Sequence, residues 1–187
     1  MAIDDDIESF PPILSKQQIR EINKTGLPAT VSLMTWNRAY SVARDGDSFH
    51  TMFRKCCNYQ QTLVVIKTVE GDILGGFADT PWGNGQYKRS GGLQRSKSFF
   101  GSGRAFLFAN NPNDFVEQER VGYNNSASTL RNRNGSKETM HFYRWTGDND
   151  YCQICDKDGG KIGMGGGGAF GFYVQENFTI GSSGSCR

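Results

Sequence analysis

The spacing of hydrophobic residues changes near residue 62, from the spacing of helices to the alternation typical of strands. Before that point, Ile19 and Ile22 lie three positions apart and share one helical face. Ser15 precedes them and suits the N-cap, because its hydroxyl accepts a hydrogen bond from a free first-turn N–H. A glycine and a proline follow and favour termination. The pattern predicts a helix at about residues 16–24.

A second helical pattern precedes the first strand. Four apolar residues follow the i, i+3, i+4, i+7 spacing of a helix buried on one side. They are Phe49, Met52, Phe53 and Cys56. Asp47 or Ser48 is placed to cap the helix, and two basic residues near its end suit the negative end of the helix dipole.

From residue 62 the chain reads as a series of short strands. "TLVVIKTV" is a nearly continuous β-branched run, which is typical of an inner strand, and "DILGGFAD" returns after a turn. Further strand-like segments are "AFLFAN", "HFYRW", "YCQIC", "KIGMG" and "AFGFYV". No helical pattern alternates with them, so parallel β-α-β units are disfavoured. We predict an α+β, mainly β fold: a two-sheet antiparallel β-sandwich with a few short helices.

Composition and charge limit the class of protein. The chain has 187 residues, which suits one domain, and a formal net charge of +2, which does not imply nucleic acid. We expect an acidic N-terminal leader at 1–13 and a single domain at 14–187. Three consecutive aspartates in the leader argue against secretory and mitochondrial targeting signals, and no apolar run has the length of a membrane span. This predicts a cytoplasmic protein whose five cysteines are reduced.

Two polar stretches, at about 83–98 and 117–138, are expected to form surface loops. The stretch 86–104 contains Lys88, Arg89, Arg95, Lys97 and Arg104. Basic residues mixed with aromatic ones are a weak signal for binding anionic lipid or another polyanion. A solvated loop is the favoured interpretation, and lipid binding stays open as an alternative.

The segment "GMGGGGAFGFYV" raises the question of phosphate binding. Gly163, Gly165 and Gly168 satisfy the spacing G-x-G-x-x-G, but a dinucleotide fingerprint needs a helix after the glycines. Here an alternating strand pattern follows instead. The glycines are therefore interpreted as a bend that needs φ > 0 or close backbone approach. Valine at Gly166 or Gly167 should cost stability.

Sites for metal or catalysis are hard to assemble. Cys152 and Cys155 form a C-x-x-C, but no second pair supplies the further ligands of a structural zinc site. His50 and His141 are not paired in the sequence, and the Asp-Lys-Asp-Gly stretch at 156–159 lacks the spacing of a calcium loop. No nucleophile–base arrangement stands out, so we predict no enzyme activity, no cofactor and no metal.

Several motifs occur in one order along the chain and resemble the TLDc domain, the domain of the eukaryotic oxidation-resistance proteins. They are D-G-x-S at 45–48, V-I-K at 65–67, A-x-x-P-W at 78–82, F-x-G-x-G-x-x-F-L-F at 99–108, the glycine run and G-S-S-G-x-C at 181–186. The glycine motif comprises Gly165, Gly166, Gly167, Gly168, Phe170 and Gly171. The match covers about Leu14 to Cys186.

This resemblance implies a sandwich of two antiparallel sheets and a function. Members of the family protect cells against oxidative stress, and several bind and regulate the vacuolar proton pump, the V-ATPase. The family brings no established active site. We therefore expect a non-enzymatic protein–protein interaction module, cytoplasmic and recruited to vacuolar or lysosomal membranes. Family domains usually continue past G-S-S-G-x-C with closing strands, so a truncated C-terminus with an unpaired sheet edge is expected here.

Candidate contact residues lie in three predicted loops, because loops carry recognition on rigid sandwiches. They are Asp79, Trp82, Thr146, Asp148, Asp150, Ser182 and Ser183. Trp82 and Trp145 are candidate aromatic anchors, with core packing favoured for Trp145. The chemical alternative is direct peroxide scavenging, with Cys57 and Cys186 as the redox-sensitive thiols, since basic residues adjoin both.

Overall fold

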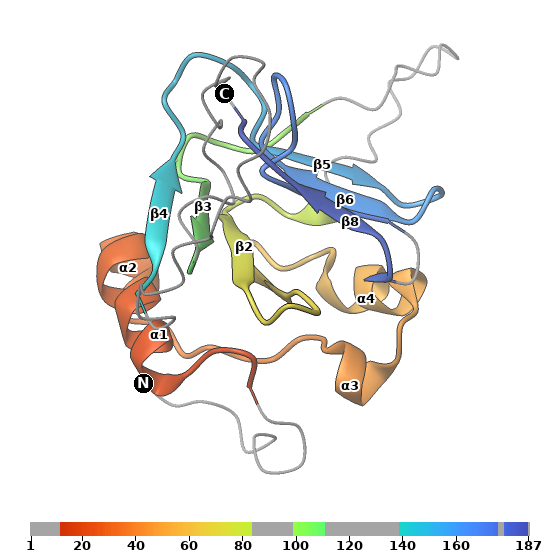
Figure 1. Cartoon of the computed structure of the whole chain (residues 1–187), viewed down its shortest axis with the longest axis horizontal. Coiled ribbons are helices and arrows are strands. Elements are labelled where there is room, and N and C mark those ends of the chain that lie inside the picture. Colours follow the sequence, from red (N-terminus) through yellow and green to blue (C-terminus); the bar gives the residue numbers. More distant parts are fainter. Residues whose placement is uncertain (1–11, 84–98, 111–138, 176–177, 187) are drawn as a thin grey trace, which may run out of the picture.

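Two four-stranded antiparallel sheets pack face to face (Figure 1). The computed structural model describes residues 12–83, 99–110, 139–175 and 178–186. The first sheet contains β1 (Thr62–Lys67), β2 (Ile73–Ala78), β3 (Phe106–Ala109) and β4 (His141–Arg144), and the second contains β5 (Gln153–Asp156), β6 (Lys161–Met164), β7 (Phe172–Val174) and β8 (Gly181–Ser183), each in that order. The predicted mainly β sandwich with a few short helices is confirmed.

The N-terminal helices form a layer over one face of the first sheet (Figure 1). They are α1 (Lys16–Glu21), the π-helical turn η2 (Ile22–Gly26) and α2 (Ala29–Ser32). Ser15 caps α1 as predicted: its Oγ accepts from the N–H of Gln18 at 3.2 Å, and Gln18 Oε1 accepts from the N–H of Ser15 at 2.9 Å. This reciprocal pair is a capping box and satisfies two otherwise free donors.

The two central strands of the first sheet, β2 and β3, are buried on both faces. Along β2, Ile73 and Phe77 face the helical layer, whereas Leu74 and Ala78 face the second sheet. Side chains alternate between the two faces of a strand, so a strand covered on both sides needs apolar residues throughout. This explains the nearly continuous apolar sequences of β2 and β3. The prediction of an inner strand for residues 62–69 is wrong, because β1 lies at the edge of the sheet.

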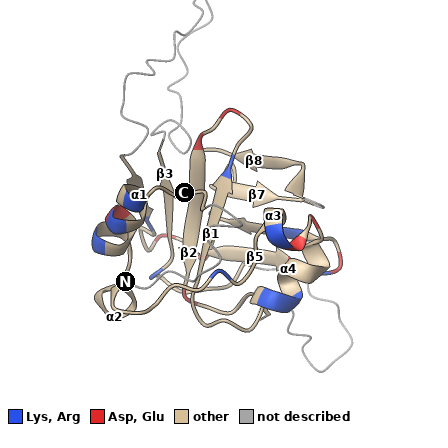
Figure 2. Ribbon diagram, turned by 90° about the horizontal axis from the view of Figure 1, so that it is seen from below, with Lys and Arg blue, Asp and Glu red and all other residues tan. Residues whose placement is uncertain are grey.

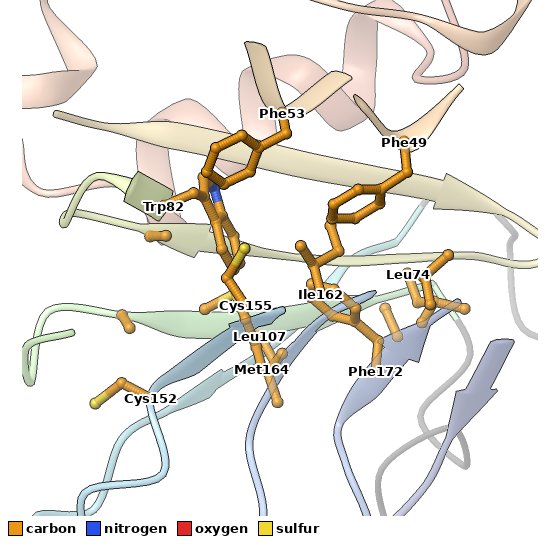
Figure 3. Packing of buried hydrophobic residues seen from close by; sticks show 14 residues of the cluster. Phe49, Phe53, Leu74, Trp82, Leu107, Cys152, Cys155, Ile162, Met164 and Phe172 are labelled. Atoms are coloured by element: carbon orange, nitrogen blue, oxygen red, sulfur yellow. The ribbon is translucent and has the colours of Figure 1, made fainter. Parts of the chain in front are cut away.

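The two sheets interlock at a pair of glycines, which face Leu107 and Met164; Figure 3 shows these two side chains in the core. A Cβ at Gly76 of β2 would lie 2.6 Å from Met164 Sδ of β6. In the reverse direction, a Cβ at Gly171, next to β7, would overlap Leu107 Cδ1 of β3. Leu107 is the register partner of Gly76, so Leu107 and Met164 lie beside one another where the sheets meet. Met164 of the second sheet therefore packs over Gly76 of the first, and Leu107 of the first sheet packs over Gly171 beside the second.

The helix α4 (Phe49–Cys56) adds two aromatic rings to the core between the sheets (Figure 3). Of the two candidate caps, Asp47 and Ser48, it is Ser48 that caps the helix: its Oγ accepts from the N–H of Thr51 at 3.2 Å. Phe49 and Phe53 are buried against Ile162 and Trp82, among other residues of this core. The predicted apolar stripe is thus the face by which α4 packs.

The short helix α3 (Val42–Asp45) ends in a carboxylate that holds α3 and α4 together. Asp45 accepts from Lys55 Nζ at 2.6 Å, from Arg44 Nε at 3.1 Å and from the N–H of Ser41 at 2.9 Å. These donors, with Arg44 first, lower the pKa of Asp45 far below its ordinary value. Gly46 follows with φ +80°, so the D-G-x-S motif supplies this carboxylate, a left-handed turn and the cap of α4.

Three short elements were not predicted from the sequence. They are α2, α3 and β8. β8 consists of Gly-Ser-Ser in what was predicted to be a loop, and it pairs with β7 at the outer edge of the second sheet. All three of its residues are exposed. The predicted loop 117–138 and residues 84–98 of the other loop lie outside the described residues, as does most of the leader.

The glycine run forms a bend between β6 and β7. Gly165 and Gly167 have φ of +75° and +92°, a conformation that costs little only for glycine. Gly166 packs under two rings, since a Cβ there would come within 2.9 Å of Phe99 Cζ and 3.1 Å of Tyr151 Cβ. The bend thus needs glycine for two separate reasons: backbone conformation and space.

We predict that Gly166→Val destabilises the chain by about 1–3 kcal/mol, the usual cost of overpacking a filled site. Gly168→Ala is the matched control, because the nearest atom to its Cβ would be Ser185 O at 4.0 Å. Urea midpoints of the two variants and the parent measure the difference. Equal midpoints for Gly166→Val and the parent would contradict the packing at this bend.

A second prediction concerns Asp45. The lowered pKa means that the folded chain keeps this carboxylate ionised where the unfolded chain binds a proton, below about pH 4. The resulting stabilisation is complete above that pH and is lost as the pH falls further. Asp45→Asn should lower the urea midpoint at pH 7, and the gap to the parent should shrink towards pH 2–3. A gap that is constant with pH would show that the charge contributes nothing.

Candidate functional site

Three loops meet at one end of the sandwich. The segment after β2 is joined to the segment before β3 by Ser102 Oγ, which donates to Asp79 Oδ2 at 2.6 Å. The segment after β2 is also joined to β5, because Gln153 Nε2 donates to the carbonyl of Thr80 at 3.1 Å. Phe100 and Gln153 exchange two backbone hydrogen bonds of 2.9 Å. Residues 79–80, 99–104 and 145–151 therefore form one surface, which we call the loop surface.

Gln153 anchors the loop surface to the second sheet. Its side chain is fully buried, and although Nε2 is bonded to Thr80, Oε1 has no hydrogen-bond partner in the described part of the chain. Burying an amide costs free energy unless it is hydrogen-bonded. The hydrogen bond from Nε2 to Thr80 offsets part of that cost and ties β5 to the segment after β2. Sequence reasoning missed this residue, because a glutamine in a short strand carries no signal of burial.

Trp145 lies on the loop surface and is 36% exposed. Its Nε1 donates to the carbonyl of Asn149 at 2.7 Å, which closes the loop between β4 and β5. One side of its ring rests on Gly103, where a Cβ would lie 2.5 Å from Cζ3. The prediction of core packing for Trp145 is therefore wrong. The indole ring packs flat on the backbone of Gly103 at the surface.

Trp82, in contrast to Trp145, is buried in the core. It is 3% exposed, its Nε1 donates to Thr62 Oγ1 at 2.8 Å, and its ring meets Phe100 edge-on with centroids 6.4 Å apart. An indole buried on this scale is not available to a partner. We therefore correct its role from aromatic anchor to a core residue that supports the loop above it.

The loop surface carries more acid than base among its described residues. Thr146, Asp148 and Asp150 are exposed, and Asp79 is half-buried. Burial raises the pKa of Cys152, and the nearby charges of Asp150 and Asp79 raise it further, so both carboxylates lie near this thiol. The structure thus brings these predicted contact residues together. Arg104 supplies one exposed positive charge.

A row of aromatic rings continues from the loop surface to the outer face of the second sheet. Tyr151 packs on Phe99 with ring centroids 4.8 Å apart, Phe99 lies 6.0 Å from Phe170, and Phe170 stacks on Tyr173 at 4.7 Å. Tyr151 is 38% exposed, and the other three rings are half-buried. Phe170, predicted as part of the glycine motif, thus belongs to this row. Phe99 begins the F-x-G-x-G-x-x-F-L-F motif, whereas Tyr151 and Tyr173 were not identified as candidate contact residues from the sequence.

Ser182 and Ser183 are not part of the loop surface. Both are exposed residues of β8, three strands from β5 and therefore about 14 Å across the sheet. The tail after β8 packs against the glycine bend, where the N–H of Ala169 donates to the carbonyl of Ser185 at 3.3 Å. The serines form a separate candidate contact at the edge of the sheet.

Three of the thiols, those of Cys56, Cys152 and Cys186, lie in settings that raise their pKa. Burial raises the pKa of Cys56 to about 11, with Cys57 and Asp45 adding to the effect. Burial also raises the pKa of Cys186, although backbone N–H groups of Gly166 and Gly171 oppose it. Cys57 is half-buried at the end of α4, where its carbonyl accepts from the N–H of Gly83 at 3.0 Å.

The described residues contain no group of three or more His, Cys, Asp or Glu side chains that could hold a metal ion. Within the same residues, no helix is long and apolar enough to cross a membrane. The predicted polyanion-binding residues Lys88, Arg89, Arg95 and Lys97 lie outside the described part of the chain. Arg104 is the one member of that set whose position is described.

Comparisons with known proteins place this arrangement in a family. The TLDc domain family matches residues 7–187. Relatives include nuclear receptor coactivator 7 of Mus musculus, 27% identical over 96% of this chain and 15% of the relative. Others are oxidation resistance protein 1 of Xenopus tropicalis, 28% identical over 98% of this chain and 18% of the relative, and that of Homo sapiens, 27% identical over 96% and 17%.

This chain therefore spans less than a fifth of the length of these relatives. The two-sheet fold and the order of the motifs agree with the family match. The chain belongs to the TLDc domain family.

Proposed function

We propose that the chain is a non-enzymatic interaction module that takes part in protection against oxidative stress by binding and regulating the V-ATPase. Membership of the TLDc family and kinship to oxidation resistance protein 1 support the link to oxidative stress. The observation that carries the module function is the loop surface. It presents Trp145 and Tyr151 beside exposed acids on a rigid sandwich.

The geometry of the loop surface suits protein recognition. Trp and Tyr are the residue types that most often dominate binding energy at interfaces. Trp145 is held by its hydrogen bond to Asn149 and by its seat on Gly103, so little side-chain freedom is lost when a partner binds. Loops fixed by Gln153 and Ser102 to the sheets keep this arrangement without a partner present.

The charges indicate the kind of surface that would bind. Asp148 and Asp150 are exposed beside the two rings. Lysine or arginine side chains of a partner gain from both, by ion pairing with the carboxylates and by cation–π contact with the rings. A basic segment on a V-ATPase subunit is the contact that this chemistry favours.

The first test is recovery of V-ATPase subunits from cell lysate on the immobilised chain. Trp145→Ala should reduce recovery at least tenfold, as expected for an aromatic anchor. Tyr59→Ala is the control, because Tyr59 is an exposed aromatic residue outside the loop surface. Asp148→Lys should also reduce recovery, whereas Asp158→Lys, the same charge change in the turn after β5, should not. No V-ATPase subunits recovered by the parent chain would refute the proposal.

Direct scavenging of peroxide by the cysteines is the competing function. A thiol must be ionised to attack peroxide, and raised pKa values keep Cys56, Cys152 and Cys186 protonated at neutral pH. The settings of these three thiols therefore support an interaction module over a scavenger.

We predict that Cys56, Cys152 and Cys186 react with hydrogen peroxide more slowly than free cysteine at pH 7. Raising the pH towards 10–11 should accelerate the reaction, because a larger fraction of each thiol is then ionised to the reactive thiolate. Mass spectrometry of each cysteine peptide after timed exposure gives the separate rates. A rate above that of free cysteine at Cys186 or Cys57 would favour scavenging instead, and Cys57→Ser would then lower the total peroxide consumption if Cys57 carries it.

A further inference from the structure

The outer surface of the N-terminal helical layer is positively charged. Lys16, Arg20 and Lys24 follow one another at four-residue intervals along α1 and η2, and all three are exposed (Figure 2). Residues four apart lie on the same side of a helix. The other side holds Ile19 and Ile22, which are buried against the first sheet. The three cations therefore point away from the sheet as a stripe.

The one acidic residue within the stripe, Glu21, is turned away from it, and a further basic residue, Arg144, lies near its end. Glu21 is half-buried, and its Oε2 accepts from the N–H of Met140 at 3.2 Å, so it faces β4 and not the stripe. Arg144 of β4 reaches the end of η2, where its Nη2 donates to the carbonyl of Thr25 at 2.8 Å. The described residues 12–37 expose three cations and no carboxylate of the exposed class.

Two large apolar side chains lie exposed on the same layer. Leu33 is 89% exposed and Met34 is 51% exposed, directly after α2. Leu27 and Val31, in the same segment, are buried against the sheet. Leu33 and Met34 thus stand exposed at the end of α2, in the same helical layer as the three cations. The segment thus exposes apolar surface that costs free energy in water.

We propose that this surface, formed by Lys16, Arg20, Lys24, Leu33 and Met34, docks on a bilayer that contains anionic phospholipid. Peripheral membrane binding combines cations, which are attracted to the headgroups, with apolar side chains that enter the interface. The helical layer exposes residues of both kinds. The inference concerns a surface separate from the loop surface and does not depend on the V-ATPase as partner.

A bilayer fits this surface better than an acidic protein segment does. An acidic helix or strand that used Leu33 would have to enclose a side chain that stands almost entirely free of its own protein. A bilayer interface accepts such a side chain by insertion and needs no complementary pocket. The three cations are spread along a helix, as suits a layer of mobile headgroups.

Co-sedimentation of the full chain with vesicles tests the proposal. Vesicles of phosphatidylcholine with phosphatidylserine should bind the chain, vesicles of phosphatidylcholine alone should bind it much less, and salt should weaken binding. Arg20→Gln/Lys24→Gln should weaken it about 25-fold, at roughly fivefold for each cation. Lys157→Gln/Lys161→Gln has the same net charge and lies in the β5–β6 hairpin, so it should bind as the parent does.

A third variant separates a membrane from a soluble polyanion. Leu33→Ser/Met34→Ser keeps every charge and changes only exposed side chains, so it should fold as the parent does and lose vesicle binding. Melting curves of all variants check the fold. The proposal is overturned if phosphatidylserine vesicles do not bind the parent, or if the two lysine control changes weaken binding equally. It is also overturned if only the charge variants, and not Leu33→Ser/Met34→Ser, reduce binding, since the attraction would then be purely electrostatic and the two apolar side chains would not enter the bilayer.

Discussion

The contact on which the rest of the structure depends is the exchange of side chains between the sheets at two glycines. Met164 fills the space over Gly76, and Leu107 fills the space over Gly171. Close packing of this kind leaves no room for a methyl group on either glycine, so the sheets are held at one separation. α4 then adds Phe49 and Phe53 to the core between the sheets. The helical layer covers the remaining face of the first sheet.

The glycine bend joins that core to the loop surface. Gly171 receives Leu107 from the core, and a few residues earlier Gly166 supports Phe99 and Tyr151 at the surface. The same short run therefore fixes the sheet packing on one side and the aromatic row on the other. Strand β7 follows this run, where a dinucleotide-binding loop needs a helix, and the glycines of the run with close neighbours pack against side chains and backbone of the domain.

Much of the fold was predictable, because long elements carry their period in the sequence. The stripe from Phe49 to Cys56, the serine caps and the strand runs all act within a few residues of one another. β8 was missed because Gly-Ser-Ser has no apolar side chain whose period could be read, and its strand form comes from pairing with β7. α2 and α3, with four residues each, are too short for a helical period to be recognised.

The candidate site was predictable only in part, and the two tryptophans show why. Both follow a strand, so local sequence treats them alike. Trp82 finds a hydrogen-bond acceptor in Thr62 and a ring partner in Phe100, whereas Trp145 finds a flat glycine seat at Gly103. These neighbours are 18 to 42 positions away in the sequence, and pairing over such distances is decided by the fold. The acids were found because exposed aspartates in turns have a local signature.

The net charge of +2 conceals a division of charge between parts of the molecule. The described loop surface has more acid than base, whereas the helical layer exposes Lys16, Arg20 and Lys24. Because charges separated by more than about 10 Å are largely screened at physiological salt, each surface acts on its partner by its own charge and not by the total. In the proposed function the acidic aromatic surface binds a basic protein segment, and in the further inference the cationic apolar surface binds an anionic membrane, so one rigid sandwich would hold the two near each other.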